Sequence, residues 1–142
     1  MSAIIDYSDV QGIVRFGYGQ LPEAGFFLLR IKNPAAARSW LRTAPVTNAT
    51  VQAPPPQTAL QVAFTGDGLA ALGLPREVLE KFSPEFISGM TGDKSRSRRL
   101  GDISANAPAQ WLWGRAENLP HLLVMLYAQA GALEHWQKTV QN

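Results

Sequence analysis

The most regular alternation of apolar and polar positions lies in residues 59–74, which read ALQVAFTGDGLAALGL. Apolar Leu60, Val62 and Phe64 alternate with Gln61, Ala63 and Thr65. Because successive side chains of a strand point to opposite faces, this pattern predicts a strand over 60–65 with one apolar face.

A turn and a short helix are expected directly after this strand. The residues Gly66-Asp67-Gly68 are typical of a turn. Leucines at 69, 72 and 74 then recur at near-helical spacing, and Gly73 followed by Pro75 is a usual helix end. A buried strand that leads into a helix is one half of an α+β unit.

Further strands and helices follow from the rest of the pattern. The apolar runs FFLLRI (26–31) and LLVMLY (122–127) predict strands, and β-branched VTNATV (46–51) predicts a weaker one. Asn33-Pro34 is a typical helix start for 34–42. Other helices are expected over 75–82, 84–90 and 130–140, whereas 91–109 is polar and reads as an irregular loop.

The order of these elements predicts the fold class. Two helices packed on one face of a four-stranded antiparallel sheet give α+β architecture of the ferredoxin-like βαββαβ kind, here of the dimeric α+β barrel type. The last helix is an addition to it. A chain of 142 residues suits a single domain, so we expect one ferredoxin-like domain over 1–142, with Phe64 and Leu123 in the core between sheet and helices.

Composition narrows the class of protein. The apolar fraction is 46% and the charged fraction 17%, as in soluble globular proteins, and the net charge is only +2. With no cysteine, disulfides and thiolate sites are excluded. We see no secretory leader and no apolar run of membrane-spanning length, so we expect a cytoplasmic protein with no membrane partner.

One stretch has the charge of a phosphate-binding patch. It carries Lys94, Arg96, Arg98 and Arg99. Aspartates at 93 and 102 flank it, and no aromatic residue interleaves it to stack on bases. We interpret it as a solvated loop and expect no nucleic-acid partner.

Several segments, in this order, resemble the N-terminal half of Dyp-type (dye-decolorising) haem peroxidases. They are DVQGIV (9–14), FLLRI (27–31), PAAARSWL (34–41), VAFT (62–65), GLAALGL (68–74), PEF (84–86) with Gly89-Met90, RRLGD (98–102) and the apolar strand with His121 and Tyr127. The resemblance covers about residues 9–136.

The resemblance implies a scaffold half of a peroxidase. In that family two ferredoxin-like halves bind haem, mainly through the second, which carries the proximal histidine and a distal arginine; a Gly-x-x-Asp-Gly motif lies between the halves. The nearest string here, GMTGD (89–93), lacks the final glycine. We therefore expect haem in the complete enzyme, none in this chain alone, and no catalytic, cofactor-binding or metal-binding residue on it.

The candidate chemical groups of the chain fit this expectation. Haem ligation needs an imidazole directed into an apolar cavity, and the chain offers only His121 and His135. We interpret His121 as a strand-end histidine bonded to backbone, and His135 as an exposed helical residue. Asp102 beside Arg98 and Arg99 could be a distal acid and its cation, but a loop held by ion pairs is the interpretation we favour.

Two functional hypotheses remain open. In the first, the chain is the scaffold half of a hydrogen-peroxide-dependent peroxidase of organic donors and is inactive without a complementary haem-bearing C-terminal half. In the second, it is a catalytically inactive interaction module that forms a homodimer or binds a protein partner. Trp111, Trp113 and Trp136 are the interface anchors expected in the second hypothesis.

Overall fold

The computed structural model describes residues 4–141, the side chain of Ala116 excepted. The strands are β1 (Glu23–Leu29), β2 (Thr58–Phe64) and β3 (Leu122–Ala128). The α-helices are α1 (Pro34–Thr43), α2 (Gly66–Ala71), α3 (Arg76–Leu79), α4 (Pro84–Ser88), α5 (Lys94–Leu100) and α6 (Leu133–Gln141). Single 3₁₀ turns lie at η1 (Tyr7–Asp9), η2 (Gly12–Val14), η3 (Ser104–Asn106), η4 (Pro108–Gln110) and η5 (Ala116–Asn118).

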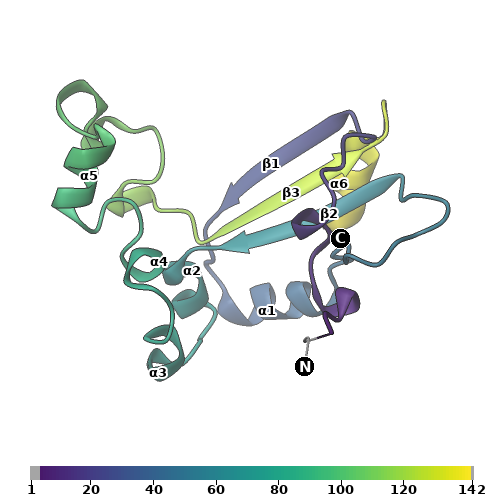
Figure 1. The fold of residues 1–142 in the computed structure, drawn as a ribbon, viewed down its shortest axis with the longest axis horizontal. Helices are drawn as coiled ribbons and strands as arrows, with labels where there is room; N and C mark the ends of the chain where they lie inside the picture. Colours follow the sequence, from purple (N-terminus) through teal and green to yellow (C-terminus); the bar gives the residue numbers. More distant parts are fainter. Residues whose placement is uncertain (1–3, 142) are drawn as a thin grey trace. The chain divides into compact units, whose positions relative to one another are not determined.

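The three strands form one sheet in the order β1-β3-β2. The arrow of β3 runs opposite to those of its two neighbours (Figure 1), so the sheet is antiparallel. The predicted α+β, ferredoxin-like fold class is confirmed.

The expected fourth strand over 46–51 is wrong. Within residues 4–141 the segment makes only an isolated bridge, between Asn48 and Gln11. Thr47 lies beside β2, where its N–H donates to Leu60 O at 3.0 Å and its Oγ1 accepts from Leu60 N at 3.1 Å. Because a side-chain oxygen takes the place of a backbone acceptor, the β-branched segment follows the strand without forming a ladder.

By its internal contacts the chain divides into two compact units. The first comprises 1–27, 42–62 and 124–142, and the second comprises 28–41 and 63–123. The prediction of one ferredoxin-like domain over 1–142 stays a prediction.

The first unit contains most of the buried core. Leu60 of β2 and Leu126 of β3 are its largest fully buried apolar side chains. Tyr18, Leu21 and Ala59 form a second buried cluster, with Tyr127 packed against it. In α6, Trp136 donates its indole N–H to Ala59 O at 3.2 Å, which joins that helix to β2.

The second unit consists of short helices joined by capped turns. In α1, Asn33 Oδ1 accepts from Ala36 N at 3.1 Å, as the sequence predicts. Arg38 of the same helix donates to Leu72 O at 2.6 Å, at the end of α2. The predicted stop after α2 is confirmed, because Gly73 has φ 91°, a left-handed conformation that favours glycine.

Two predictions about this unit are wrong. The residues 66–68 are the first turn of α2, because Thr65 Oγ1 accepts from Gly68 N and caps the helix. Residues 94–100, expected in an irregular loop, form α5, with Asp93 as N-cap and left-handed Gly101 as C-cap. None of the helices within 4–141 combines the length and apolarity needed to cross a bilayer.

Candidate functional site

The first unit contains a cavity of about 360 Å³, a volume at the lower end of those of small-molecule sites. Its lining is mostly aromatic, proline and amide side chains: Phe16, Tyr18, Gln20, Thr47, Asn48, Thr50, Val51, Gln52, Pro55 and Pro56. Tyr18 is the one titratable side chain of this lining. The lining therefore offers apolar contact and hydrogen bonds but little charge.

Tyr18 forms the inner wall of the cavity. It is 3% exposed, has φ 50°, and its ring lies 5.1 Å from that of Tyr127 at an interplanar angle of 32°. Burial, and then the neighbouring Tyr127, raise the pKa of the Tyr18 hydroxyl. A tyrosine hydroxyl is protonated at neutral pH in any case, and the raised pKa extends this to more alkaline pH, so the group can serve as a hydrogen-bond donor.

Gln61 connects Tyr18 to two other segments. Its Nε2 donates to Tyr18 Oη at 3.0 Å and to Thr47 O at 2.9 Å, and its Oε1 accepts from Ile13 N at 3.1 Å. The alternation places Gln61 on the polar face of the strand, yet it is fully buried. The N-terminal arm covers this face, and the amide satisfies the backbone groups that the arm brings with it.

His121 has a structural position, as the sequence predicts. The backbone N–H of His121 donates to Leu29 O at 2.8 Å, and the Nδ1 of its ring accepts from Ile31 N at 3.2 Å. The neutral imidazole in this contact carries its proton on Nε2. His121 thus fixes the chain between β1 and the start of β3.

His135 lies on α6 and is exposed. Its carbonyl accepts from Thr139 Oγ1 at 3.0 Å. The cavity lining contains neither histidine. In residues 4–141, no three side chains from His, Asp or Glu gather in a way that could hold a metal ion.

The RRLGD segment is arranged differently from the expectation. Among the ion pairs of the described residues, none involves Asp102, and its buried Oδ2 has no hydrogen-bond partner. Asp93 is the carboxylate that the basic residues affect. Hydrogen bonding from Ser95 N, and then the charges of Arg96 and Arg99, lower the pKa of Asp93.

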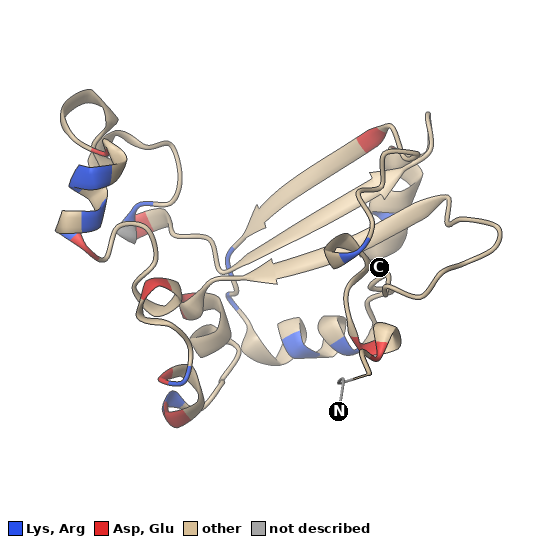
Figure 2. Ribbon diagram, viewed as in Figure 1, with Lys and Arg blue, Asp and Glu red and all other residues tan. Residues whose placement is uncertain are grey.

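The basic residues of 94–99 lie on α5, where Figure 2 shows them along a short helix. Arg96 donates to Gly89 O at 2.6 Å and to Ser88 Oγ at 3.2 Å, so it joins α5 to the end of α4. Lys94, Arg98 and Arg99 are exposed. At least Arg96 of these basic residues therefore has a structural role. The absence of a nucleic-acid partner stays a prediction.

The three predicted interface tryptophans have different surroundings. Trp111 is half-buried and donates its indole N–H to Asn106 O at 2.9 Å. Trp136 is half-buried against β2, as described above. Trp113 is 59% exposed, and its neighbour Leu112 is 92% exposed. An interface role stays a prediction for all three, and Trp113 offers the largest free surface.

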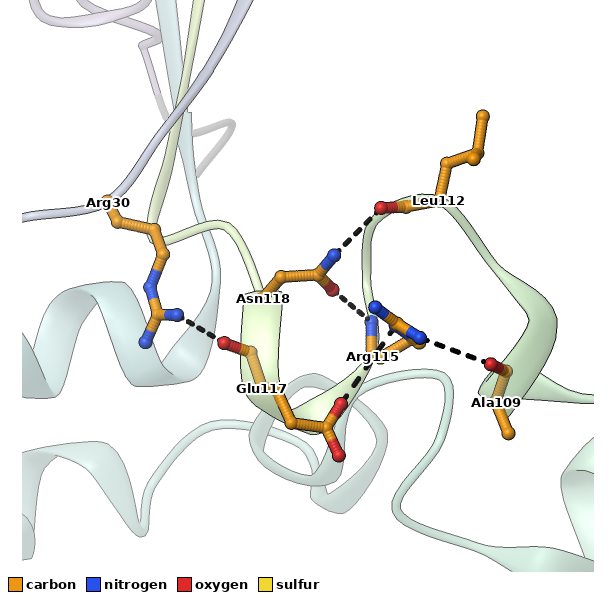
Figure 3. A network of polar contacts seen from close by, with 6 residues as sticks. All are labelled: Arg30, Ala109, Leu112, Arg115, Glu117 and Asn118. Carbon is orange, nitrogen blue, oxygen red and sulfur yellow. Dashed lines mark hydrogen bonds and ion pairs between the residues drawn. The ribbon is translucent and has the colours of Figure 1, made fainter.

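A polar network holds the loop that presents Leu112 and Trp113 (Figure 3). Asn118 donates to Leu112 O at 2.7 Å and accepts from Arg115 N at 3.0 Å. Arg115 also donates to Ala109 O at 3.2 Å, and Arg30 donates to Glu117 O at 2.5 Å. These bonds fix the loop backbone, so the two apolar side chains are exposed on an ordered segment. Sequence reasoning missed this network, because Arg115 is not a typical N-cap residue and Asn118 is not the glutamate or glutamine of a usual capping box.

Comparison with known proteins finds similarity in structure alone. No protein-family model matches the sequence. No curated protein matches it either.

Three solved structures share the fold. The first is a fungal DyP-type peroxidase from Auricularia auricula-judae, with a TM-score of 0.71, 22% identity, and coverage of 97% of this chain and 30% of that one. The second is an ancestral D-type dye decolorizing peroxidase, with a TM-score of 0.72, 21% identity, and coverage of 98% of this chain and 31% of that one. The third is a dye-decolorizing peroxidase whose heme pocket was engineered for asymmetric sulfoxidation. Its TM-score is 0.68 and its identity 23%, and the match covers 95% of this chain and 29% of that one.

The chain spans about three tenths of the length of each of these peroxidases. At these identities the likeness is one of fold. The resemblance to Dyp-type peroxidases that the sequence suggests is thus confirmed at the level of fold: nearly the whole of this chain has the structure of one part of a dye-decolorising peroxidase.

Proposed function

We propose that the chain is the N-terminal scaffold half of a Dyp-type haem peroxidase and acts together with a complementary C-terminal half. The observation that supports this proposal most strongly is the fold match, which covers 95–98% of this chain but about 30% of each peroxidase. In this proposal the complete assembly oxidises organic donors with hydrogen peroxide, and this chain provides structural support.

Haem does not fit a site made by the described residues alone. His121 uses Nδ1 in a backbone contact, His135 is exposed, and the cavity of the first unit is lined by neither. A haem-bearing partner therefore has to supply the iron ligand and the groups that act on peroxide.

The surface of the second unit supports a missing partner. Few of the apolar side chains within residues 63–123 are buried; one that is buried is Leu122, which is 5% exposed. By contrast, many large apolar side chains of this unit are exposed, namely Leu28, Leu29, Phe82, Ile87, Met90, Leu100, Ile103, Leu112 and Trp113. Where such side chains lie side by side they form an apolar surface of the kind that another polypeptide covers.

The test is a hemin titration followed by absorption in the Soret region. We expect no histidine-ligated Soret signature from the chain alone, and one when a haem-bearing C-terminal peroxidase half is added, together with peroxide-dependent oxidation of a dye. The variant His135→Gln is the control, because an exposed histidine can bind hemin at the surface. A signature from the chain alone that survives this substitution contradicts the division of roles. No signature with the second half contradicts the pairing.

The second candidate function is an inactive interaction module. The ordered loop that exposes Leu112 and Trp113 favours it. The variant Trp113→Ala then weakens association with a partner or a second copy without changing the free energy of unfolding. Unchanged association, measured by light scattering, removes Trp113 as an anchor.

A further inference from the structure

The two edges of the sheet differ. At the outer edge of β2, Gln11 donates to Val62 O at 2.9 Å and accepts from Val62 N at 2.8 Å. Thr47 bonds both backbone groups of Leu60, with its backbone N–H as donor and its hydroxyl oxygen as acceptor. The Gln11 amide and Thr47 therefore occupy the positions that an added strand would need.

The edge formed by β1 is open. This strand ends the sheet on the other side (Figure 1), and within residues 4–141 no comparable contact covers it. Alternate residues of an edge strand direct their N–H and C=O groups away from the sheet, where another strand can pair with them. Proteins usually protect such edges with lysine, proline or a bulge.

The sequence of β1, EAGFFLL, lacks lysine, arginine and proline. Its one charged residue is Glu23, at the start of the strand, where Figure 2 is coloured red. This residue, Glu23, is engaged elsewhere, since its carboxylate accepts from Gly131 N at 2.8 Å and Leu133 N at 3.1 Å. Phe26 at the middle of the strand is 60% exposed, and Leu28 is 41% exposed.

We propose that β1 pairs antiparallel with β1 of a second copy of this chain, so that two sheets join into one across a two-fold axis at Phe26. When the two β1 strands (Glu23–Leu29) pair along their full length, their middle residue, Phe26, lies opposite Phe26 of the second copy. Ala24 then lies opposite Leu28, a small side chain beside a large one, and Glu23 lies opposite Leu29. No like charges face each other, and identical surfaces meet as a two-fold interface requires.

The aromatic contacts of the first unit continue into this interface. Phe26 packs edge-on against Tyr127, with ring centroids 6.1 Å apart at 86°, and Tyr127 in turn packs against Tyr18. Pairing of two copies brings the two Phe26 rings together and extends this row across the axis. Directly opposite aromatic side chains are a stabilising cross-strand pair.

The experiment is sedimentation velocity over a wide range of concentration. We expect a reversible monomer–dimer equilibrium in the wild-type chain. Phe26→Lys places two lysines opposite each other and raises the dissociation constant by about tenfold or more. Val14→Lys is the matched control, because Val14 is 76% exposed and lies in η2, outside β1; it leaves the equilibrium unchanged. Far-UV circular dichroism checks that both variants fold.

A charge-swap mixture tests the two-fold register itself. Phe26→Lys and Phe26→Glu are each monomeric, and an equimolar mixture forms a heterodimer, because position 26 faces its own copy only in this register. A monomer at all concentrations overturns the proposal, as does a dimer that Phe26→Lys leaves intact or a mixture that stays monomeric. The outcome is independent of haem and of a C-terminal half, so it is distinguishable from failure of the proposed function.

Discussion

At the residue scale, Gln61 is the side chain whose role is least visible in the sequence. It is a polar residue at 0% exposure, and each end of its amide is used. In the unfolded chain these polar groups form hydrogen bonds with water. The net stabilisation by Gln61 therefore comes from avoiding unpaired polar groups in the folded state. Loss of the amide therefore costs more than the sum of ordinary surface hydrogen bonds.

The variant Gln61→Leu tests this role. It keeps the size of the side chain but leaves Ile13 N without its partner and removes the bonds to Tyr18 Oη and Thr47 O, of which Thr47 O keeps only Gly12 N. We expect a loss of about 2–4 kcal/mol in the free energy of unfolding. Gln52→Leu, an exposed glutamine of the same cavity, is the control and should stay within about 0.5 kcal/mol. Urea melts give both values. Equal losses in the two variants would contradict a buried network.

Gly68 is required by a close approach of two segments. A Cβ at this position would overlap the carbonyl group of His121. We expect Gly68→Ala to cost about 1–3 kcal/mol, as overpacking does. At Gly19 nothing lies near the position of a Cβ, so Gly19→Ala should be neutral or stabilising by up to about 1 kcal/mol. Thermal melts compare the two; an unaffected Gly68→Ala protein would mean that α2 and residue 121 are not in contact.

At the element scale, Glu23 of β1 caps α6 from outside the helix. The first N–H groups of a helix have no partner within it, and a carboxylate near them also interacts with the helix dipole. Hydrogen bonding from Gly131 N, then from Leu133 N, lowers the pKa of Glu23 from its ordinary 4.5. Capping thus joins the first strand to the last helix.

This lowered pKa gives a pH dependence with a definite sign. The folded state holds the carboxylate in its ionised form more strongly than the unfolded state does. The stabilisation is therefore complete above pH 4.5 and is lost as the pH falls through the lower pKa of the folded state. We expect the urea midpoint to fall more between pH 6 and acid pH in the wild type than in Glu23→Gln. Glu77→Gln, an exposed glutamate of α3, should behave as the wild type.

At the scale of the whole molecule, burial is unequal. The fully buried apolar side chains lie mostly in the first unit, whereas the second unit exposes many of its own. Regions with few buried apolar contacts open with less free energy than a packed core. The stability of the isolated chain is therefore concentrated in β2, β3 and α6.

Core truncations test this distribution. The sequence places Phe64 and Leu123 in the core, but both are half-buried, and Leu60 and Leu126 are the fully buried leucines. Leu126→Ala and Leu60→Ala should each cost about 2–5 kcal/mol. Leu112→Ala, at a residue 92% exposed, should change little. A loss in urea melts below about 1 kcal/mol for Leu126→Ala would contradict the buried core.

The strongest local signals in the sequence gave correct elements. The N-cap Asn33 and the helix stop at Gly73 act as predicted, and Ser83 before Pro84 caps the helix expected from 84, because caps depend on a few neighbouring residues. The helix α5 was missed because its residues are polar throughout and show no apolar period. Its cap signals, Asp93 and Gly101, were nevertheless present in the sequence.

By itself the sequence determined the fold class, the positions of three strands and most helices, because these follow from periodicity, caps and turn residues close along the chain. It also indicated that His121 bonds to backbone, but the partner of its Nδ1, Ile31 N, lies 90 residues away and was decided by the tertiary structure. The tertiary structure decided which residues are buried, that residues 46–51 accompany β2 without joining the sheet, and that β1 remains an open edge. These features depend on contacts between segments far apart in the sequence, such as Gln11 with Val62 and Gln61 with Tyr18, and local propensity carries no information about such pairs.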